Sequence, residues 1–254
     1  MQQKSEDVMS ENEIYLSVVI PAYNEQERIA DTLYVVKEYL SRKPYLSEII
    51  VVDDGSVDWT TEVVKTVDLY NETFKGQSVS TIMENVKNVG KGFSVARGLL
   101  KARGKYIVFS DADLSTPIDE LEKFLPKLES GCDVVIGSRR MDDSEVDEKP
   151  FFREAMSFVF NMVVSLFAVR GIKDTQCGFK AFSKQAARDI AKHQKLYGFS
   201  FDVEQLYIAH KLGYCITEVP VKWTHADGSK VSPVKDALHM FADVMRIRLI
   251  HRTL

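Results

Sequence analysis

The sequence predicts an α/β protein, built as a single domain on a doubly wound, mostly parallel sheet. Short apolar, β-branched runs alternate with segments of helical apolar spacing through the first 140 residues. Several of the apolar runs end in small, polar or acidic residues, as strands do at the ligand-binding edge of an open sheet. A chain of 254 residues is long enough for one such domain.

The first half of the chain provides the alternation. Residues 1–13 are polar and charged and predict a disordered tail, and residues 14–140 follow as the strand-rich half. The expected strands are Tyr15–Ile20 (ended by Pro21), Glu48–Asp53, Val79–Glu84, Tyr106–Ser110 and Asp133–Gly137. The expected helices are Glu25–Leu40, Thr60–Leu69, Phe93–Ala102 and Ile118–Ser130.

The pattern changes in residues 141–254, which we assign to the same domain, 14–254. An acidic loop, Asp142–Glu148, comes first and is expected to be a plain exposed loop or a mobile lid. Helices dominate after it. The expected elements are helices at Arg153–Val169, Ser183–Lys192, Val203–Leu212 and Val234–Arg252, with one strand at Ile216–Trp223.

Composition excludes several classes of protein. The formal net charge is −4 and the sequence pI about 5.8, so overall charge gives no support for nucleic-acid binding. Three scattered cysteines, Cys132, Cys177 and Cys215, predict reduced thiols of a cytoplasmic protein and no structural zinc site. The N-terminus lacks the apolar core of a signal peptide, and the most apolar run, Ala155–Val169, is too short to span a bilayer.

Two acidic residues follow the fourth expected strand. Asp111 and Asp113 come directly after Tyr106–Ser110, and Ser115–Pro117 then opens a helix. In an extended chain a spacing of two puts both carboxylates on one side, where they repel unless a cation or a proton lies between them. Mg²⁺ or Mn²⁺ together with a diphosphate satisfies this requirement. We therefore predict a divalent metal site, with a solvated turn or a helix cap as the alternative.

A glycine-rich loop, Asn88–Gly92, precedes the third expected helix. Its glycines would let backbone N–H groups approach phosphate oxygens, and Lys91 would add a positive charge, so we expect a phosphate cradle. A turn that opens a helix would explain the glycines but not Lys91. The loop lacks the spacing of a Walker A motif, and no GxGxxG follows the first strand, which argues against a dinucleotide-dependent oxidoreductase.

Other side chains at the strand ends have two readings each. Asp53 and Asp54 could recognise a base or a ribose, or could form an ordinary tight turn with the Gly-Ser that follows them. Tyr23 could stack on a base or lie in the core. Arg139, at the end of a strand, is a candidate anion binder.

Taken together, the motifs resemble those of family 2 glycosyltransferases, which have the GT-A fold. The matching segments occur in the family's order and are Val19–Glu25, Ile50–Ser56, Asn88–Gly92, Asp111–Asp113 and Gly137–Arg139. The later segments look like the dolichyl-phosphate β-glucosyltransferase branch of the polyprenyl-phosphate glycosyltransferases. They are Gly171–Lys180, Phe201–Ala209, Glu218–Trp223 and Gly228–Lys230.

The resemblance implies a nucleotide-sugar half (14–140) and an acceptor half (141–254), and it implies roles for individual residues. The nucleoside would be held by Pro21, Ala22, Tyr23, Glu25 and Asp53. The donor diphosphate and the metal would be held by Lys91, Asp111 and Asp113, of which Asp113 would be catalytic. The acceptor phosphate would meet Arg139, Arg153 and Lys230. The sugar pocket would be lined by residues of 174–180 and 202–204, among them Gln176, Gly178, Asp202 and Glu204, with Asp202 as a candidate base.

The implied reaction is transfer of glucose from UDP-glucose to a polyprenyl phosphate, with inversion. GDP-mannose or UDP-N-acetylglucosamine as donor, a soluble acceptor, and a nucleotide-sugar-binding module without catalysis are the alternatives. Eukaryotic members of the branch carry an N-terminal membrane anchor that this sequence lacks, and Leu114–Pro117 differs from their wording. Undecaprenyl phosphate or another polyprenyl phosphate is therefore an alternative to dolichyl phosphate.

The last helix predicts contact with a membrane surface. Residues 228–254 carry five Lys or Arg against two Asp, and apolar residues such as Met245 and Leu249 alternate with Arg246 and Arg248. We expect a peripheral protein on the cytoplasmic face of a membrane. A core helix, a solvated helix or a dimer interface would have a similar pattern, and the sequence leaves the oligomeric state open.

Overall fold

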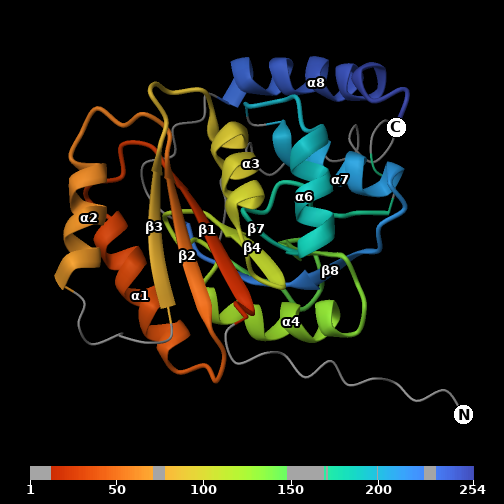
Figure 1. Ribbon diagram of the computed structural model, residues 1–254. Helices are drawn as coiled ribbons and strands as arrows, with labels where there is room; N and C mark the ends of the chain where they lie inside the picture. The colour runs from red at the N-terminus through yellow and green to blue at the C-terminus, as the bar shows by residue number, and fades with distance from the viewer. Residues whose placement is uncertain (1–12, 71–77, 148–168, 170, 199, 226–232) are drawn as a thin grey trace, which may run out of the picture.

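A central sheet of seven strands organises the molecule (Figure 1). The computed structural model describes residues 13–70, 78–147, 169, 171–198, 200–225 and 233–254. The sheet has the order β3-β2-β1-β4-β7-β5-β8, and β6 and β9 form a separate pair. The strands are β1 (Leu16–Ala22), β2 (Ser47–Asp53), β3 (Ser78–Glu84), β4 (Tyr106–Ser110), β5 (Val134–Ser138), β6 (Glu145–Val146), β7 (Phe179–Ser183), β8 (Ile216–Pro220) and β9 (Lys222–Trp223).

Helices cover both faces of the sheet, because alternate residues of each buried strand point to opposite sides. Val18 and Ile20 of β1 belong to the apolar cluster with α1, α2 and α4, whereas Val19 belongs to the cluster with α3, α6 and α7. This is the predicted doubly wound arrangement. The helices are α1 (Ile29–Ser41), α2 (Thr60–Tyr70), α3 (Lys91–Lys101), the short η2 (Ile118–Glu120), α4 (Leu121–Glu129), α6 (Lys184–His193), α7 (Phe201–Lys211) and α8 (Pro233–Ile250).

The expected elements of residues 14–140 are confirmed with small shifts at their ends. β1 runs through Pro21 to Ala22 and does not stop at the proline. Pairing of β1 with β4 ends at Val19, so on that side Pro21 needs no N–H donor. Helix α1 begins at Ile29, later than expected, because the backbone carbonyl of Glu25 first closes a turn with the N–H groups of Arg28 and Ile29.

One central strand was not predicted. β7 lies between β4 and β5 and runs antiparallel to both, so the sheet is mostly but not wholly parallel. It places the segment that ends at Gly178 beside the end of β4, because Phe179 pairs with Ser110.

The second half departs from expectation in two further places. Residues 145–146 of the acidic loop form a strand with β9, and the expected strand Ile216–Trp223 is split at Val221 between two sheets. The C-terminal helix is confirmed as α8. The apolar helix expected at 153–169 lies outside the described residues except for Val169, which is buried. None of the helices within the described ranges is both long and apolar enough to cross a bilayer.

Candidate active site

The end of β4 and the start of β7 meet at the carboxyl edge of the sheet. The backbone N–H of Asp111 donates to the carbonyl of Gly178 over 3.2 Å. A Cβ atom on Gly178 would lie 2.1 Å from Asp111 Oδ2, so any larger residue here would displace this carboxylate. The close approach fixes where the Asp111 side chain lies, and it brings two predicted site residues together.

Lys91 faces Asp111 across this edge. It is the first residue of α3, and its Nζ lies 2.6 Å from Asp111 Oδ1. The contact is an ion pair without the angles of a hydrogen bond, so Oδ1 is a buried oxygen that accepts none. The two side chains remain 32% and 27% exposed, which leaves the pair open to a ligand.

Three carboxylates share this neighbourhood. Burial raises the pKa of Asp111, the nearby charges of Asp113 and Asp202 raise it further, and Lys91 opposes the shift. Burial by itself would lower the pKa of Lys91, but the same three aspartates raise it above the usual lysine value. Because Lys180 pairs with Asp202, two lysines face three aspartates, and the cluster keeps an excess of negative charge.

Asp111 and Asp113 come together through a turn and not through an extended chain as predicted. Leu114 donates its N–H to the Asp111 carbonyl over 3.2 Å and has a φ of 46°. The Ala112 carbonyl accepts from Thr32 Oγ1 over 2.5 Å, which anchors the turn on α1. Asp113 is exposed, and its Oδ1 accepts from the N–H of Ser115.

The expected phosphate cradle at Asn88–Gly92 is not what the backbone forms. Asp54 accepts from the N–H groups of Val89 and Gly90, and the Gly92 N–H donates to the Tyr197 carbonyl over 2.9 Å. These three amides are therefore already bound within the protein, and the glycines allow close backbone packing. The Lys91 side chain of this loop faces the acidic cluster.

Asp53 takes the turn alternative, whereas the Asp54 carboxylate binds the 85–90 segment. Asp53 Oδ2 accepts from the N–H groups of Gly55 and Ser56 over 3.1 and 3.0 Å, and its Oδ1 accepts from the Ser56 hydroxyl. Both aspartates are only 3% exposed. A carboxylate offers about four acceptor positions, so the role of Asp53 toward a nucleoside stays a prediction.

The loop after β1 is joined to the loop after β2. Glu25 N–H donates to Thr60 Oγ1 over 2.7 Å, and Asn24, at a φ of 54°, donates its N–H to Ser56 Oγ. Pro21 and Ala22 are buried, whereas Tyr23 and Glu25 are partly exposed. The loop thus stands at the carboxyl edge of β1, and the nucleoside-binding role of these four residues stays a prediction.

Arg139 is held by Asp174, a partner that the sequence did not reveal. Its Nε and Nη2 lie 2.7 and 2.9 Å from the Asp174 carboxylate, and its backbone N–H donates to the same group. Burial alone would raise the pKa of Asp174, but Arg139 holds it well below its ordinary value. Glu218 in turn accepts from the N–H groups of Lys173 and Asp174. Of the other predicted phosphate-binding residues, Arg153 and Lys230 lie outside the described residues.

Asp202 is ion-paired with Lys180, which is fully buried and also donates to the Cys177 carbonyl over 2.6 Å. Two ammonium groups lie near the Phe109 ring, since Lys91 Nζ is 5.4 Å and Lys180 Nζ 5.7 Å from its centroid. Sequence reasoning placed residues 174–180 in the sugar pocket but did not find this pair. Nothing in the local pattern signals it, because the partners are 22 residues apart.

The remaining sugar-pocket residues differ in position. Gln176 is partly exposed and donates its N–H to Asp174 Oδ1 over 3.3 Å. Glu204 is fully buried, two residues after Asp202 on α7, so its side chain points roughly 200° around the helix from Asp202. Its carboxylate binds the N–H groups of Lys195 and Leu196. The structure therefore does not join Glu204 to the Asp111 cluster.

A divalent cation fits the Asp111 cluster with help from a ligand. Within the described part of the chain, no three His, Cys, Asp or Glu side chains converge as a complete metal-binding group. Asp111 and Asp113 offer two carboxylates, one with a buried oxygen that accepts no hydrogen bond. Mg²⁺ and Mn²⁺ are commonly bound through one or two carboxylates plus substrate phosphates.

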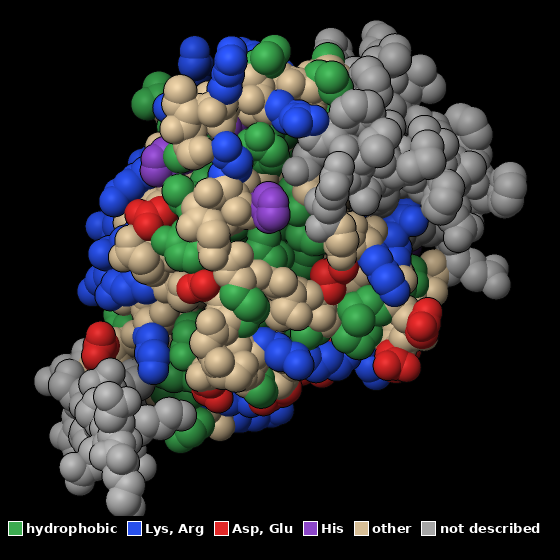
Figure 2. All heavy atoms as spheres, turned by 90° about the vertical axis from the view of Figure 1, so that its right-hand side faces the viewer, with side chains coloured by type: hydrophobic (Ala, Val, Ile, Leu, Met, Phe, Trp, Pro, Cys, Tyr) green, Lys and Arg blue, Asp and Glu red, His purple; other side chains and the backbone are tan. Residues whose placement is uncertain are grey.

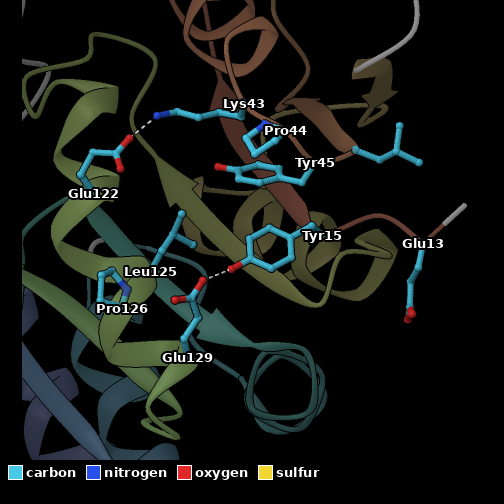
Figure 3. A pocket seen from close by; sticks show the side chains of 10 residues that line it. Glu13, Tyr15, Lys43, Pro44, Tyr45, Glu122, Leu125, Pro126 and Glu129 are labelled. Atoms are coloured by element: carbon cyan, nitrogen blue, oxygen red, sulfur yellow. Dashed lines mark hydrogen bonds and ion pairs between the residues drawn. The ribbon is translucent and has the colours of Figure 1, made fainter. Parts of the chain in front are cut away.

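A pocket of about 780 Å³ lies at the opposite edge of the sheet (Figure 3). Tyr15, just before β1, donates its hydroxyl to Glu129 of α4, and Lys43 pairs with Glu122. The rings of Tyr15 and Tyr45 lie with centroids 4.5 Å apart. Because this pocket is at the amino end of β1, it contains none of the predicted site residues.

Comparison with known proteins gives one family. The model of Glycosyl transferase family 2 matches residues 17–191. The chain is 39% identical over 246 residues to a dolichyl-phosphate beta-glucosyltransferase of Dictyostelium discoideum, covering 92% of this chain and 74% of that protein. It is 37% identical over 257 residues to the enzyme of that name from Saccharomyces cerevisiae, covering 95% and 76%.

Solved structures show the same fold at lower identity. Mannosyl-3-phosphoglycerate synthase from Rubrobacter xylanophilus matches with a TM-score of 0.66 at 18% identity, covering 94% of this chain and 74% of that one. Glucosyl-3-phosphoglycerate synthase from Mycobacterium tuberculosis, in complex with Mn²⁺, UDP-glucose and phosphoglyceric acid, matches with a TM-score of 0.65 at 18% identity, covering 93% and 79%. The fold of this chain is therefore GT-A, as predicted.

Proposed function

The chain belongs to glycosyl transferase family 2, and we propose that it transfers glucose from UDP-glucose to a polyprenyl phosphate, with inversion and with Mg²⁺ or Mn²⁺. The observation that carries the proposal is the meeting of Lys91, Asp111 and Asp113 beside Gly178. The acceptor class is taken from the relatives named dolichyl-phosphate beta-glucosyltransferase, and the donor from the neighbour in complex with UDP-glucose.

The donor diphosphate would lie over the Asp111 cluster. Lys91 would turn from Asp111 toward the phosphate oxygens, and Asp111 and Asp113 would hold the cation. When bound, the cation supplies positive charge that offsets the charge growing on the leaving diphosphate. Pro21–Glu25 and Asp53, at the neighbouring strand ends, would hold the nucleoside. The excess of carboxylate over ammonium supports this arrangement.

The acceptor phosphate supplies its own nucleophile. The second pKa of a phosphate monoester is near 6, so an oxygen is already ionised at neutral pH and needs no strong general base. That oxygen bonds to the anomeric carbon from the face opposite UDP while the bond from this carbon to the UDP oxygen breaks, and UDP leaves. The ion pair of Asp202 with Lys180 supports an electrostatic role for Asp202 in place of proton transfer.

Arg139 would reach the acceptor phosphate from the end of β5. Its contacts with Asp174 use Nε and Nη2, so Nη1 stands outside this clamp. A guanidinium fixed in this way offers a preorganised donor to an anion and offsets repulsion between the two phosphate groups. Arg153 and Lys230 are proposed to assist it.

Membrane contact would come through α8. Val244 and Ile247 are buried against α7, whereas Arg246, Arg248 and Arg252 are exposed, with Met245 41% and Leu249 75% exposed. Along the top of Figure 2, where α8 lies, basic and apolar side chains share the surface. This mixture suits an anionic bilayer surface, and we propose peripheral binding to the cytoplasmic face, where the lipid acceptor would be reached.

The test is transfer of labelled sugar to a short-chain polyprenyl phosphate with Mn²⁺ or Mg²⁺. Wild type should glucosylate the lipid from UDP-glucose, and Asp113→Ala should lose the activity. Asp143→Ala, which changes an exposed aspartate of the 141–147 loop, is the matched control and should stay active. Transfer from GDP-mannose or UDP-N-acetylglucosamine but not from UDP-glucose would refute the donor assignment, and transfer only to a soluble acceptor would refute the lipid.

A further inference from the structure

A buried pair that the proposed reaction does not use joins the C-terminus to the active site. We propose that His251 and Glu204 are positioning residues, and that they act through residues 194–197 to hold the turn that carries Lys91. The inference rests on the proposed function only for the role of Lys91 toward the donor. The chain of contacts itself is independent of any substrate.

The first link joins the end of α8 to α7. His251 Nε2 lies 2.6 Å from Glu204 Oε1, and the two side chains are 3% and 0% exposed. The same carboxylate accepts from the N–H of Lys195 and, over 2.7 Å, from the N–H of Leu196. A buried carboxylate needs such partners, because an unpaired one is strongly unfavourable. Glu204 therefore ties residues 195–196 to the end of the chain.

The second link joins residues 194–197 to the start of α3. Gln194 donates its side-chain amide to the Gly92 carbonyl over 2.8 Å. The Tyr197 carbonyl accepts from the Gly92 N–H over 2.9 Å. The first N–H groups of a helix have no partner inside the helix, so Tyr197 supplies from outside what the first turn of α3 lacks. Both backbone groups of Gly92 are thus bound to one segment.

Close packing stiffens this second link. A Cβ atom on Gly90 would lie 2.3 Å from the Tyr197 carbonyl oxygen, and one on Gly92 would lie 2.5 Å from Phe201 Cβ. Lys91 stands between these two glycines, which pack on Tyr197 and Phe201. A shift of Tyr197 and Phe201 must therefore move the Lys91 backbone, and with it the ammonium that faces Asp111. This packing explains the two glycines that flank Lys91.

The C-terminal helix α8 therefore has two different roles along its length. Met245, Arg246, Arg248 and Leu249 of α8 are exposed, while His251, after the last turn of the helix, reaches inward to Glu204. The helix contributes no side chain to the Asp111 cluster among the described contacts. It nevertheless sets the position of Lys91, so donor binding depends on how the C-terminus is seated.

Hydrogen exchange at the Gly92 amide tests the linkage without substrate. His251→Phe keeps the ring and removes the donor, and we expect exchange at residues 90–93 to rise by about tenfold or more. His251→Gln restores a donor and should bring exchange back toward wild type. Val244→Ala loosens the packing of α8 on α7 but does not change the contacts of Glu204. It should lower thermal stability, while the Gly92 amide should stay more protected from hydrogen exchange than the rest of the chain.

Gln194→Met tests the same linkage independently, in case the His251 variants do not fold. It breaks the contact with the Gly92 carbonyl while the buried pair stays intact, and it should also speed exchange at residues 90–93. Unchanged exchange there in folded His251→Phe or Gln194→Met protein would overturn the proposal. So would an equal increase throughout the molecule.

A double-mutant cycle with Lys91→Met then tests the positioning role in sugar transfer. If His251 acts through Lys91, His251→Phe should lower transfer in the wild-type background and have little further effect once Lys91 is gone. Additive losses would mean a general structural role and would contradict the inference. If wild type transfers no glucose, the proposed function fails, whereas the exchange measurement still decides whether the linkage exists.

Discussion

Asp111, which is partly exposed, and Asp174, which is buried, both lie near the carboxyl edge of one sheet, and their electrostatic environments are opposite. Asp174 receives two side-chain contacts from Arg139 and accepts backbone N–H groups, and its pKa lies well below the ordinary value. Asp111 has one ion-pair contact with Lys91 and two neighbouring carboxylates, and its pKa is raised. The same residue type is therefore stabilised in its ionised form at one position and destabilised in that form at the other.

The difference distinguishes carboxylates that stabilise the free protein from carboxylates that are stabilised by a bound cation. A carboxylate whose charge is matched and hydrogen-bonded in the free protein contributes to stability and has little left to offer a substrate. A carboxylate placed among like charges lowers stability, and it regains that free energy when a cation or a diphosphate complex arrives. Arg139 is an intermediate case, because its side-chain contacts with Asp174 use Nε and Nη2 and not Nη1.

The largest effect is expected at Asp174. Asp174→Asn leaves the guanidinium of Arg139, which is only 18% exposed, without its counter-charge, and it should lower the free energy of unfolding by about 3–5 kcal/mol. Urea denaturation followed by circular dichroism measures the change. Glu145→Gln removes an exposed partner of Lys222 and is the matched control, with an expected change below about 1 kcal/mol. An equal decrease in the free energy of unfolding of both variants would contradict the expected difference between the buried and the exposed ion pair.

Lys91→Met should have the next largest effect, on catalysis. Loss of one preorganised charge at a developing anion typically costs about 10²- to 10³-fold in rate, and kcat/KM for the nucleotide sugar should fall by that factor. Lys87→Met is the control, since Lys87 is exposed on the same loop and should keep wild-type kinetics. If Lys91→Met had the wild-type rate, Lys91 would not be part of the donor site.

The free energy of unfolding at acidic pH provides a further test of the comparison between Asp174 and Asp111. Because the folded-state pKa of Asp174 is lowered, its stabilisation is fully present above the unfolded value near 4 and is lost as pH falls toward the folded value. The stability difference between wild type and Asp174→Asn should therefore be constant near neutral pH and narrow below about pH 4. A difference that stays constant down to pH 2 would mean that the Arg139 clamp is not the cause.

Much of the first half was predictable from sequence, because its signals are local. Apolar runs and helical spacing fixed β1 to β5 within a few residues, and Lys91, Asp111 and Asp113 were all expected near the donor. Strand β7 was missed because Phe179–Ser183 is short and its partners are distant in sequence. The apolar residues Phe179, Ala181 and Phe182, followed by the helix cap at Ser183, were the available signal.

The contacts of two predicted site segments could not be predicted from sequence, and for the same physical reason. A glycine-rich loop suggests free amides, yet Asp54 and the Tyr197 carbonyl had already bound them, and neither partner can be read from the loop itself. Glu204 resembled a pocket residue by family position, but its neighbours are set by tertiary contacts with a histidine 47 residues away. Sequence predicts which residues reach the sheet edge better than it predicts which of their atoms remain unbound.

The most direct test of this comparison is the thermal unfolding midpoint of wild type and Asp111→Asn at neutral pH, each with and without Mn²⁺ and UDP together. Because the folded-state pKa of Asp111 is raised, its ionised form lowers stability as pH rises through that range, so Asp111→Asn should melt above wild type in the absence of ligand. A ligand that binds only the folded protein raises its midpoint, and we expect that rise in wild type and not in Asp111→Asn. A variant that melts below wild type, or that responds to Mn²⁺ and UDP as wild type does, would contradict the account.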